Sequence, residues 1–297
     1  MTPGRSRMGT PRPVVALHCS GADGDQWLPL GESLGIDYRV HTPEHFGCER
    51  VGHWAGEHAF GIEDEAQRTI ELIDASDHPM HLVGHSYGGG VALYAALQRP
   101  NRIASLSLYE PTAFHLLRQM GADGAGAHAE IAAIASEASE WVLAGDYRKS
   151  VAHFVNYWNG PGAWKTMSPR VQAKLVRWAP KIPLDFRALM QASAPLSAYA
   201  ALKCRTVLIR GENAPFPTRL IIEALARAIQ LAEVSVASGC GHMGPLTHPL
   251  PIAETIASHI RRVDAEDAAS GTRGRPPPPC PDDCPISVRA RGLVSVS

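Results

Sequence analysis

The stretch from Met80 to Gly90 reads MHLVGHSYGGG and places Ser86 inside a G-x-S-x-G pentapeptide. Its apolar first half predicts a buried strand, and the residues after the glycines, Val91 to Gln98, favour a helix. Ser86 therefore lies on a tight turn from strand to helix. A serine in such a turn needs a strained backbone, and side chains two residues before and after it would collide, which explains Gly84 and Gly88.

The predicted helix also has a chemical consequence. Its free N–H groups and positive dipole end point at Ser86, so the backbone N–H of Tyr87 can stabilise a negatively charged oxygen there.

A pentapeptide of this kind also arises by chance in a chain with 27 glycines. The alternative, a serine in an ordinary glycine-rich turn, is disfavoured only by the flanking strand and helix and by two further stretches described below.

Composition limits the classes of function. The chain has 297 residues, 45% hydrophobic and 19% charged, which suits one catalytic domain with an insertion. Its 28 basic and 29 acidic residues give no electrostatic reason to expect a nucleic acid or an anionic membrane as partner. Six irregularly spaced cysteines do not form a disulfide framework, and no apolar run approaches the ~20 residues that span a bilayer. We therefore expect a cytoplasmic protein with a small-molecule substrate; the oligomeric state is not indicated.

Strands and helices alternate along much of the chain. The predicted strands are Val14 to Leu17, Tyr38 to Thr42, Met80 to Val83, Ile103 to Tyr109, Thr206 to Ile209 and Val234 to Val236. The predicted helices between and after them include one from about Ile62, one from about Thr218 to Ile229 and a last one from about Ile252 to Arg262. This order predicts an α/β fold with a mostly parallel central sheet flanked by helices, whose site lies at the carboxyl ends of the strands.

The alternation stops between residues 112 and 200, where long helical patterns and several aromatic residues occur. We expect residues 14–111 and 201–263 to form the core and residues 112–200 to form a helical insertion. Residues 1–13 are rich in Gly, Pro and Arg. Residues 264–297 are also rich in these residues and lack a periodic apolar pattern, and we expect both segments to be disordered. Two cysteines in the latter segment are weak evidence of a metal or disulfide site.

From about Val14 to about Val263 the sequence resembles the α/β-hydrolase superfamily. The resemblance rests on the strand-to-helix turn around Ser86, which is called the nucleophile elbow in that superfamily, and on the alternation of strands and helices. The resemblance implies the α/β-hydrolase fold with a helical cap formed by the insertion. It implies that Ser86 is the catalytic nucleophile of a serine hydrolase.

The resemblance extends to a second stretch, His18-Cys19-Ser20-Gly21, directly after the first strand. Relatives carry His-Gly-x here, in the loop that supplies the second N–H of the oxyanion hole, and Cys19 replaces the usual glycine. The match implies that the backbone N–H groups of Ser20 and Tyr87 form the oxyanion hole. The alternative is an ordinary loop that leaves the strand.

A third stretch, Ser238 to Pro245, places His242 in a glycine-containing loop after the last strand. This is the position of the general base in the superfamily, so the resemblance implies that His242 is catalytic. The other histidines show no metal-ligand spacing, and we predict no metal site and no cofactor.

The acid of the triad departs from the usual pattern. Relatives most often carry an Asp where this chain has Ala214. A subset, including some haloalkane dehalogenases, carries a Glu after the preceding strand, and Glu110 matches that arrangement. We favour Glu110, with Glu212 as the alternative acid, because the acid needs only to reach the ring nitrogen of His242 that faces away from Ser86.

Aromatic residues of the insertion are candidates for the substrate pocket. We select Tyr157 and Trp158, because the glycines and proline from Gly160 to Gly162 end a helix there and can turn the segment toward the cavity. The alternative is that these aromatic residues form the core of the cap itself.

We therefore expect a Ser-His-acid hydrolase that acts on a small or medium ester, lactone or related acyl substrate through an acyl-enzyme. Carbon–carbon bond hydrolysis, acyl transfer and perhydrolysis use the same triad and stay open. A haloalkane dehalogenase is disfavoured, because that reaction needs a carboxylate nucleophile where this chain has Ser86. The alternative to an enzyme is a non-catalytic small-molecule binder on the same fold. This alternative is suggested by Ala214, which stands where relatives most often carry the acid of the triad. The substrate itself does not follow from the sequence.

Overall fold

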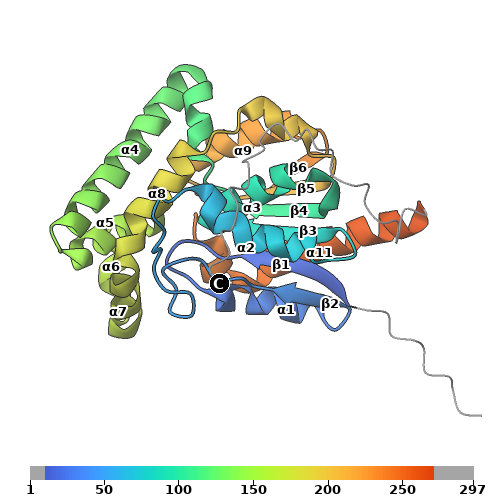
Figure 1. Cartoon of the computed structure of the whole chain (residues 1–297), viewed down its shortest axis with the longest axis horizontal. Coiled ribbons are helices and arrows are strands. Elements are labelled where there is room, and N and C mark those ends of the chain that lie inside the picture. The colour runs from blue at the N-terminus through green and yellow to red at the C-terminus, as the bar shows by residue number, and fades with distance from the viewer. Residues whose placement is uncertain (1–10, 271–297) are drawn as a thin grey trace, which may run out of the picture.

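The computed structural model describes residues 11–270. Its centre is a six-stranded sheet with the strand order β2-β1-β3-β4-β5-β6, in which every neighbouring pair is parallel (Figure 1). The strands are β1 (Arg12–Leu17), β2 (Tyr38–His41), β3 (Met80–His85), β4 (Ile103–Tyr109), β5 (Arg205–Gly211) and β6 (Ala232–Ala237). The expected α/β architecture with a parallel central sheet is confirmed.

Helices connect and cover the strands. They are α1 (Leu28–Leu34), α2 (Ile62–Asp74), α3 (Tyr87–Gln98), α4 (Gly121–Leu143), α5 (Tyr147–Asn159), α6 (Ala163–Thr166), α7 (Pro169–Trp178), α8 (Ile182–Gln191), α9 (Phe216–Ala228), α10 (Gly244–Thr247) and α11 (Pro249–Ala269). Short 3-10 turns are η1 (Gly24–Trp27), η2 (Pro100–Arg102), η3 (Phe114–Gln119), η4 (Ala179–Lys181) and η5 (Leu196–Ala201).

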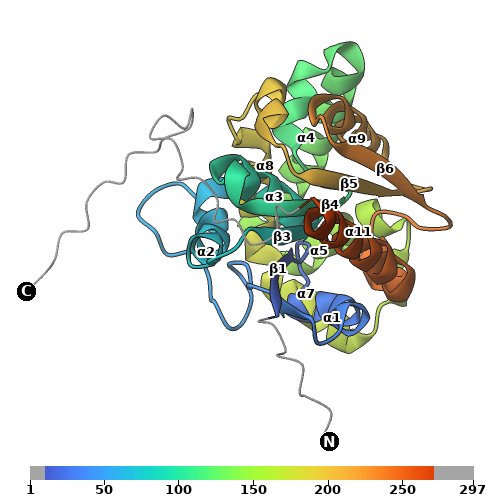
Figure 2. The ribbon, with the colours of Figure 1, turned by 90° about the vertical axis from the view of Figure 1, so that its right-hand side faces the viewer.

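The sheet is buried on both faces, which is why its central strands read as unbroken apolar runs. Alternate residues of β1 point to opposite faces: Val14 and Ala16 belong to a core cluster with residues of α1 and α11, whereas Val15 and Leu17 belong to a second cluster that includes residues of α2 and α3. Figure 2 shows α1 and α11 on one side of the sheet and α2 and α3 on the other.

The segment between β4 and β5 runs from η3 to η5 and includes α4 to α8, which lie together beyond one end of the sheet (Figure 1). The helical nature of this insertion agrees with the sequence pattern. Its aromatic residues Phe154 and Trp158 pack with Phe114 and Phe186, so part of the cluster is a hydrophobic core, as the alternative interpretation held. Its status as a separate cap domain stays a prediction.

Both predicted ends of the core require correction. Helix α11 continues to Ala269, so the segment from Asp264 onward is not disordered throughout. The reason is tertiary: Asp264 accepts a hydrogen bond of 2.6 Å from Tyr38 and pairs with Arg12, and Glu266 pairs with Arg205. At the other end β1 begins at Arg12, two residues before the predicted strand. The remaining parts of the two segments, residues 1–10 and 271–297, lie outside the described residues.

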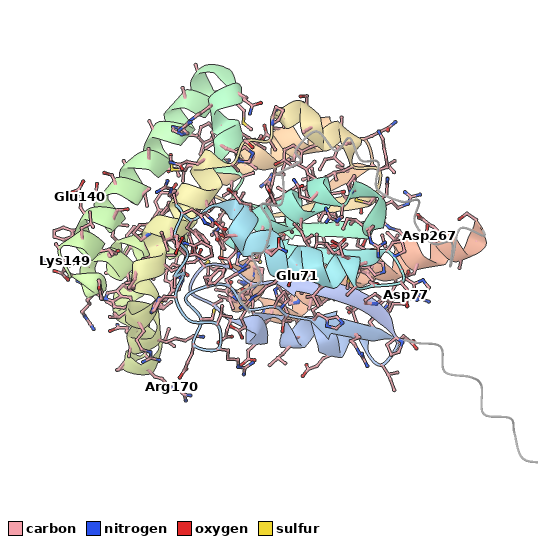
Figure 3. All side chains as sticks on the ribbon, in the orientation of Figure 1. Glu71, Asp77, Glu140, Lys149, Arg170 and Asp267 are labelled. Atoms are coloured by element: carbon pink, nitrogen blue, oxygen red, sulfur yellow. The ribbon has the colours of Figure 1, made fainter. Side chains whose placement is uncertain are left out.

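Charged side chains surround the molecule. Figure 3 labels six of them, on α2 and α11, on the loop after α2 and on the insertion: Glu71, Asp77, Glu140, Lys149, Arg170 and Asp267. Among residues 11–270, no helix is long and apolar enough to cross a lipid bilayer.

Buried histidines make the fold sensitive to acid. Burial lowers the pKa of His85 to about 3 and the pKa values of His115 and His259 to about 4. Histidines of the unfolded chain titrate near 6.5, so between about pH 6.5 and pH 4 the unfolded state binds more protons and acid favours unfolding. We expect the free energy of unfolding to fall by about 2 kcal/mol per histidine between pH 7 and pH 5.

Urea unfolding at pH 7, 6 and 5 measures this loss. The variant His115→Gln should lose less stability over the same interval than the wild type, because one neutral buried histidine has been removed. Equal stability of the wild type at pH 7 and pH 5 would contradict the prediction.

Candidate active site

Ser86 lies between β3 and α3 with φ 52° and ψ −116°, a region that L-residues rarely adopt. The flanking glycines are required by close packing. A Cβ on Gly84 would lie 2.6 Å from the carbonyl oxygen of Gly88, and a Cβ on Gly88 would lie 2.4 Å from that of Leu17. The backbone is held by the Ser86 N–H, which donates to Tyr109 O at 3.0 Å. The strained turn predicted around Ser86 is therefore present.

His242 reaches Ser86 from the loop after β6. The Ser86 hydroxyl donates to His242 Nε2 at 2.8 Å, and both side chains are buried. Two groups from neighbouring strands hold the loop: His85 Nε2–H donates to the carbonyl oxygen of His242 at 2.8 Å, and the Tyr109 hydroxyl donates to that of Gly241 at 2.7 Å. Sequence reasoning did not identify His85 or Tyr109 as supports of the histidine loop.

Glu110 completes a chain of hydrogen bonds. It follows β4 with φ 40°, is fully buried, and its Oε2 accepts from His242 Nδ1–H at 2.8 Å. The same carboxylate accepts from the Gly211 N–H and from the Thr218 hydroxyl, each at 2.9 Å. These donors satisfy a carboxylate that would be costly to bury alone, and they fix its orientation toward the imidazole.

Glu212 lies elsewhere. Its side chain is exposed, and its Oε2 accepts from the Gly239 N–H at 2.8 Å. Ala214, at the position where relatives often carry Asp, is buried and has no acidic group. The structure therefore brings Glu110, and not Glu212, to His242.

Ser20 and Tyr87 both line the cavity beside Ser86. Ser20 lies in the loop after β1, and Tyr87 is the first residue of α3. The loop is held by Gln26, whose side-chain oxygen accepts from the Cys19 N–H at 3.1 Å. The two backbone N–H groups predicted to form an oxyanion hole thus belong to residues that line the same cavity.

The cavity itself is small, about 10 Å³. Trp158 lines it and lies against His242, with ring centroids 4.1 Å apart and ring planes tilted by 31°, whereas Phe154 rather than Tyr157 is the second aromatic residue of α5 at the cavity. The Tyr157 hydroxyl instead donates to Glu130 Oε1 of α4 at 2.6 Å. Tyr157 does not line this cavity, because consecutive residues of a helix point in directions about 100° apart and Trp158 faces it; its role in a substrate pocket stays a prediction.

A buried ionic network lies next to Ser20 and Tyr87, and no sequence pattern pointed to it. Lys181, only 2% exposed, donates to Glu65 Oε2 at 2.7 Å and to the Tyr87 hydroxyl at 3.3 Å, and it pairs with Asp185. Asp185 Oδ2 accepts from the Ser20 hydroxyl at 2.6 Å. Because Lys181 and Asp185 belong to η4 and α8 and the others to the core, this network joins the insertion to the core.

The network also sets ionisation states. Burial lowers the pKa of Lys181, but Asp185 and Glu65 raise it more, so the pKa exceeds its ordinary value. Burial raises the pKa of Glu65, but Lys181 and His45 lower it more. For Asp185 burial has the larger effect, and the pKa of its carboxyl is raised.

One group of side chains has metal-ligand types. A ligand atom of each of His18, Glu44 and Cys48 lies within 4.8 Å of the other two. His18 Nε2 already accepts from the His45 N–H at 3.3 Å and lies 3.7 Å from Cys48 Sγ, so the cluster is also explained by its own hydrogen bonds. The predicted lack of a metal site stays a prediction.

The larger cavities, about 670 and 930 Å³, are not lined by Ser86 or His242.

Comparisons with known proteins identify the family of the chain. A family model described as "Alpha/beta hydrolase family" matches residues 14–255. The chain is similar to the lipase LipV of Mycobacterium tuberculosis, with 24% identity over 264 residues, covering 84% of this chain and 94% of that protein. A pimeloyl-[acyl-carrier protein] methyl ester esterase of Aliivibrio salmonicida is 31% identical over 93 residues, or 31% of this chain and 33% of the esterase.

A solved structure, the enol-lactonase from Burkholderia xenovorans LB400, matches with a TM-score of 0.65 and 16% identity, covering 86% of this chain and 94% of that one. At this identity the likeness concerns the fold alone. The chain spans between 26% and 36% of the length of three curated relatives that it matches, the esterase among them.

Proposed function

Since the chain belongs to the alpha/beta hydrolase family, we propose that it hydrolyses small or medium esters, lactones or related acyl substrates, with Ser86 as the nucleophile. The observation that carries the proposal is the unbroken path of two 2.8 Å hydrogen bonds from Ser86 through His242 to Glu110. A non-catalytic binder would have no need of a strained serine in contact with a buried histidine and carboxylate.

In the first half of the reaction, Ser86 Oγ attacks the acyl carbon while His242 Nε2 takes the hydroxyl proton. The tetrahedral intermediate collapses when His242 returns this proton to the leaving oxygen, and the alcohol departs. In the second half, His242 takes a proton from water as the water oxygen attacks the acyl-enzyme. Collapse then releases the acid and restores the Ser86 hydroxyl.

Negative charge develops on the carbonyl oxygen in both halves. We assign its stabilisation to the backbone N–H groups of Ser20 and Tyr87, at the loop after β1 and at the first turn of α3. Glu110 holds His242 with Nδ1 protonated, so that Nε2 is free to accept the proton of Ser86, and it stabilises the imidazolium that forms.

The helices of the insertion cover this site as a cap. Phe154 and Trp158 of α5 and Phe186 of α8 line the cavity beside Ser86, which suits an apolar part of an acyl substrate. Relatives named as a lipase and as a methyl ester esterase support chemistry at an acyl carbonyl.

Hydrolysis of short p-nitrophenyl esters tests the proposal. The variant His242→Ala should lower kcat by about 10⁴-fold or more, because it removes the general base while most of the packing remains. His248→Ala is a matched control, since His248 lies six residues further on and is exposed. His242→Ala with kcat within tenfold of the wild type would contradict the assignment.

A further inference from the structure

The cavity beside Ser86 combines an apolar lining with polar groups that neither step of the proposed reaction uses. Its apolar side chains come from Phe114, Phe154, Trp158, Phe186 and Leu189. Among them lie Thr112, which follows β4, and Asp185 of α8. An acyl pocket for purely hydrocarbon chains would not place a hydroxyl and a carboxyl group on its wall.

Thr112 lies directly against the nucleophile. Its N–H donates to the carbonyl oxygen of Ser86 at 3.2 Å, and its side chain is 1% exposed. Its Oγ1 is fully buried and finds no hydrogen-bond partner among the described residues. A buried hydroxyl without a partner is costly, so its place in this cavity indicates a group that a ligand satisfies.

Asp185 supplies a second polar group with spare capacity. Oδ2 accepts from the Ser20 hydroxyl and Oδ1 from Lys181, and the Tyr87 hydroxyl also interacts with this carboxyl group, which still leaves it a lone pair for a ligand. The carboxyl group is 4% exposed, so it is reached from the cavity rather than from bulk solvent.

The ionic network limits the size of the ligand. Lys181 ties η4 and α8 to Glu65 and Tyr87 of the core, and the Ser20–Asp185 hydrogen bond crosses the same boundary. Moving α8 away from the core would break these bonds and leave buried charges without their partners. Helix α8 is therefore held against the core, which favours short acyl groups over long ones that would need α8 to move.

We propose that the acyl part of the substrate is short and carries a hydroxyl group near its carbonyl carbon, which donates to Asp185 and accepts from Thr112. This inference rests on the proposed function of the site. A hydroxyl fits both partners because it donates and accepts, as Thr112 Oγ1 also does. A carboxylate in place of the hydroxyl would have no proton to donate to Asp185. An ammonium group would accept no hydrogen bond from Thr112, and it would be repelled by the nearby charge of Lys181.

The test compares esters in which a hydroxyl replaces a methyl group of the same size. One pair is p-nitrophenyl 2-hydroxypropanoate and 2-methylpropanoate, and the other is the 3-hydroxybutanoate and 3-methylbutanoate. Each kcat/KM is divided by the spontaneous hydrolysis rate of the same ester, which removes intrinsic reactivity. The wild type should prefer the hydroxy ester by about tenfold or more in at least one pair, since a site built to bond a hydroxyl rejects an analogue without it.

Variants then assign the preference to residues. Thr112→Val removes the hydroxyl and keeps the shape, so the preference should fall to about onefold to threefold, and Thr112→Ser should keep it. Asp185→Asn should also reduce it. Ser107→Ala is the matched control, because Ser107 Oγ on β4 is likewise buried without a partner among the described residues but does not line the cavity. Melting curves show that each variant is folded.

The outcomes separate the two proposals. If the wild type hydrolyses all four esters with no preference in either pair, the inference is wrong and the serine hydrolase assignment stands. An undiminished preference in folded Thr112→Val and Asp185→Asn would also overturn it. If no ester is hydrolysed and a fluorophosphonate does not label Ser86, the proposed function fails and the inference fails with it.

Discussion

Replacing Ser86 with alanine should abolish labelling by a fluorophosphonate and lower kcat by about 10⁵- to 10⁶-fold, because no other group can form the acyl-enzyme. The probe reacts with a serine whose proton is taken by a neighbouring base, and Ser86 donates to His242 Nε2 at 2.8 Å. Labelling is measured by intact-protein mass, which rises by the mass of one phosphonyl group in the wild type alone.

A control keeps this result specific. Ser107→Ala removes a buried serine hydroxyl from the adjacent strand β4 and should label as the wild type does. Labelling of Ser86→Ala at another serine, or turnover close to that of the wild type, would show that the nucleophile lies elsewhere.

Exchange of the buried acid is the second large effect. Glu110→Gln should lower kcat by about a thousandfold or more and change KM little. A glutamine can still accept from Gly211 or Thr218, but its amide N–H₂ faces His242 Nδ1 and favours the imidazole form that is protonated on Nε2. That form cannot take the proton of Ser86.

Glu212→Gln is the matched control, since its carboxylate is exposed and accepts from Gly239 rather than from His242. It should change kcat by less than about threefold. The opposite ranking of the two variants would assign the acid to Glu212. If neither variant matters, Ala214→Asp becomes informative, because a large gain in kcat would mean that the site lacks a working carboxylate.

Backbone strain links these two predictions. Ser86 and Glu110 are the non-glycine residues with positive φ among residues 11–270, and each follows one of the neighbouring strands β3 and β4. Such conformations cost about 1–3 kcal/mol each and persist where the surroundings hold them. Here the Ser86 N–H donates to Tyr109 O and the Glu110 N–H donates to Ile209 O, so each strained residue is bonded to the next strand. The strain places both side chains at the same edge of the sheet.

Much of this arrangement follows from local sequence. The apolar run before Ser86 and the glycines around it predict a strand, a turn and a helix without knowledge of any distant residue, because the backbone conformation depends on near neighbours. The alternation of strands and helices predicts the parallel sheet and places Ser86, Glu110 and the His242 loop after strands. Since parallel strands end at one edge of a sheet, their meeting there is also predicted.

The choice between Glu110 and Glu212 depended on tertiary structure. Both follow strands, and only the positions of β4, β5 and the His242 loop in space decide which carboxylate reaches the imidazole. The extent of α11 was decided in the same way, by contacts of Asp264 with residues more than 200 positions away.

Tertiary structure likewise decided which side chains line the cavity. Thr112, Phe154 and Asp185 come from the end of β4, from α5 and from α8, and they line one cavity. Sequence periodicity specifies which residues share a face of one element. It does not specify which faces of different elements meet, because that depends on the packing of the whole chain.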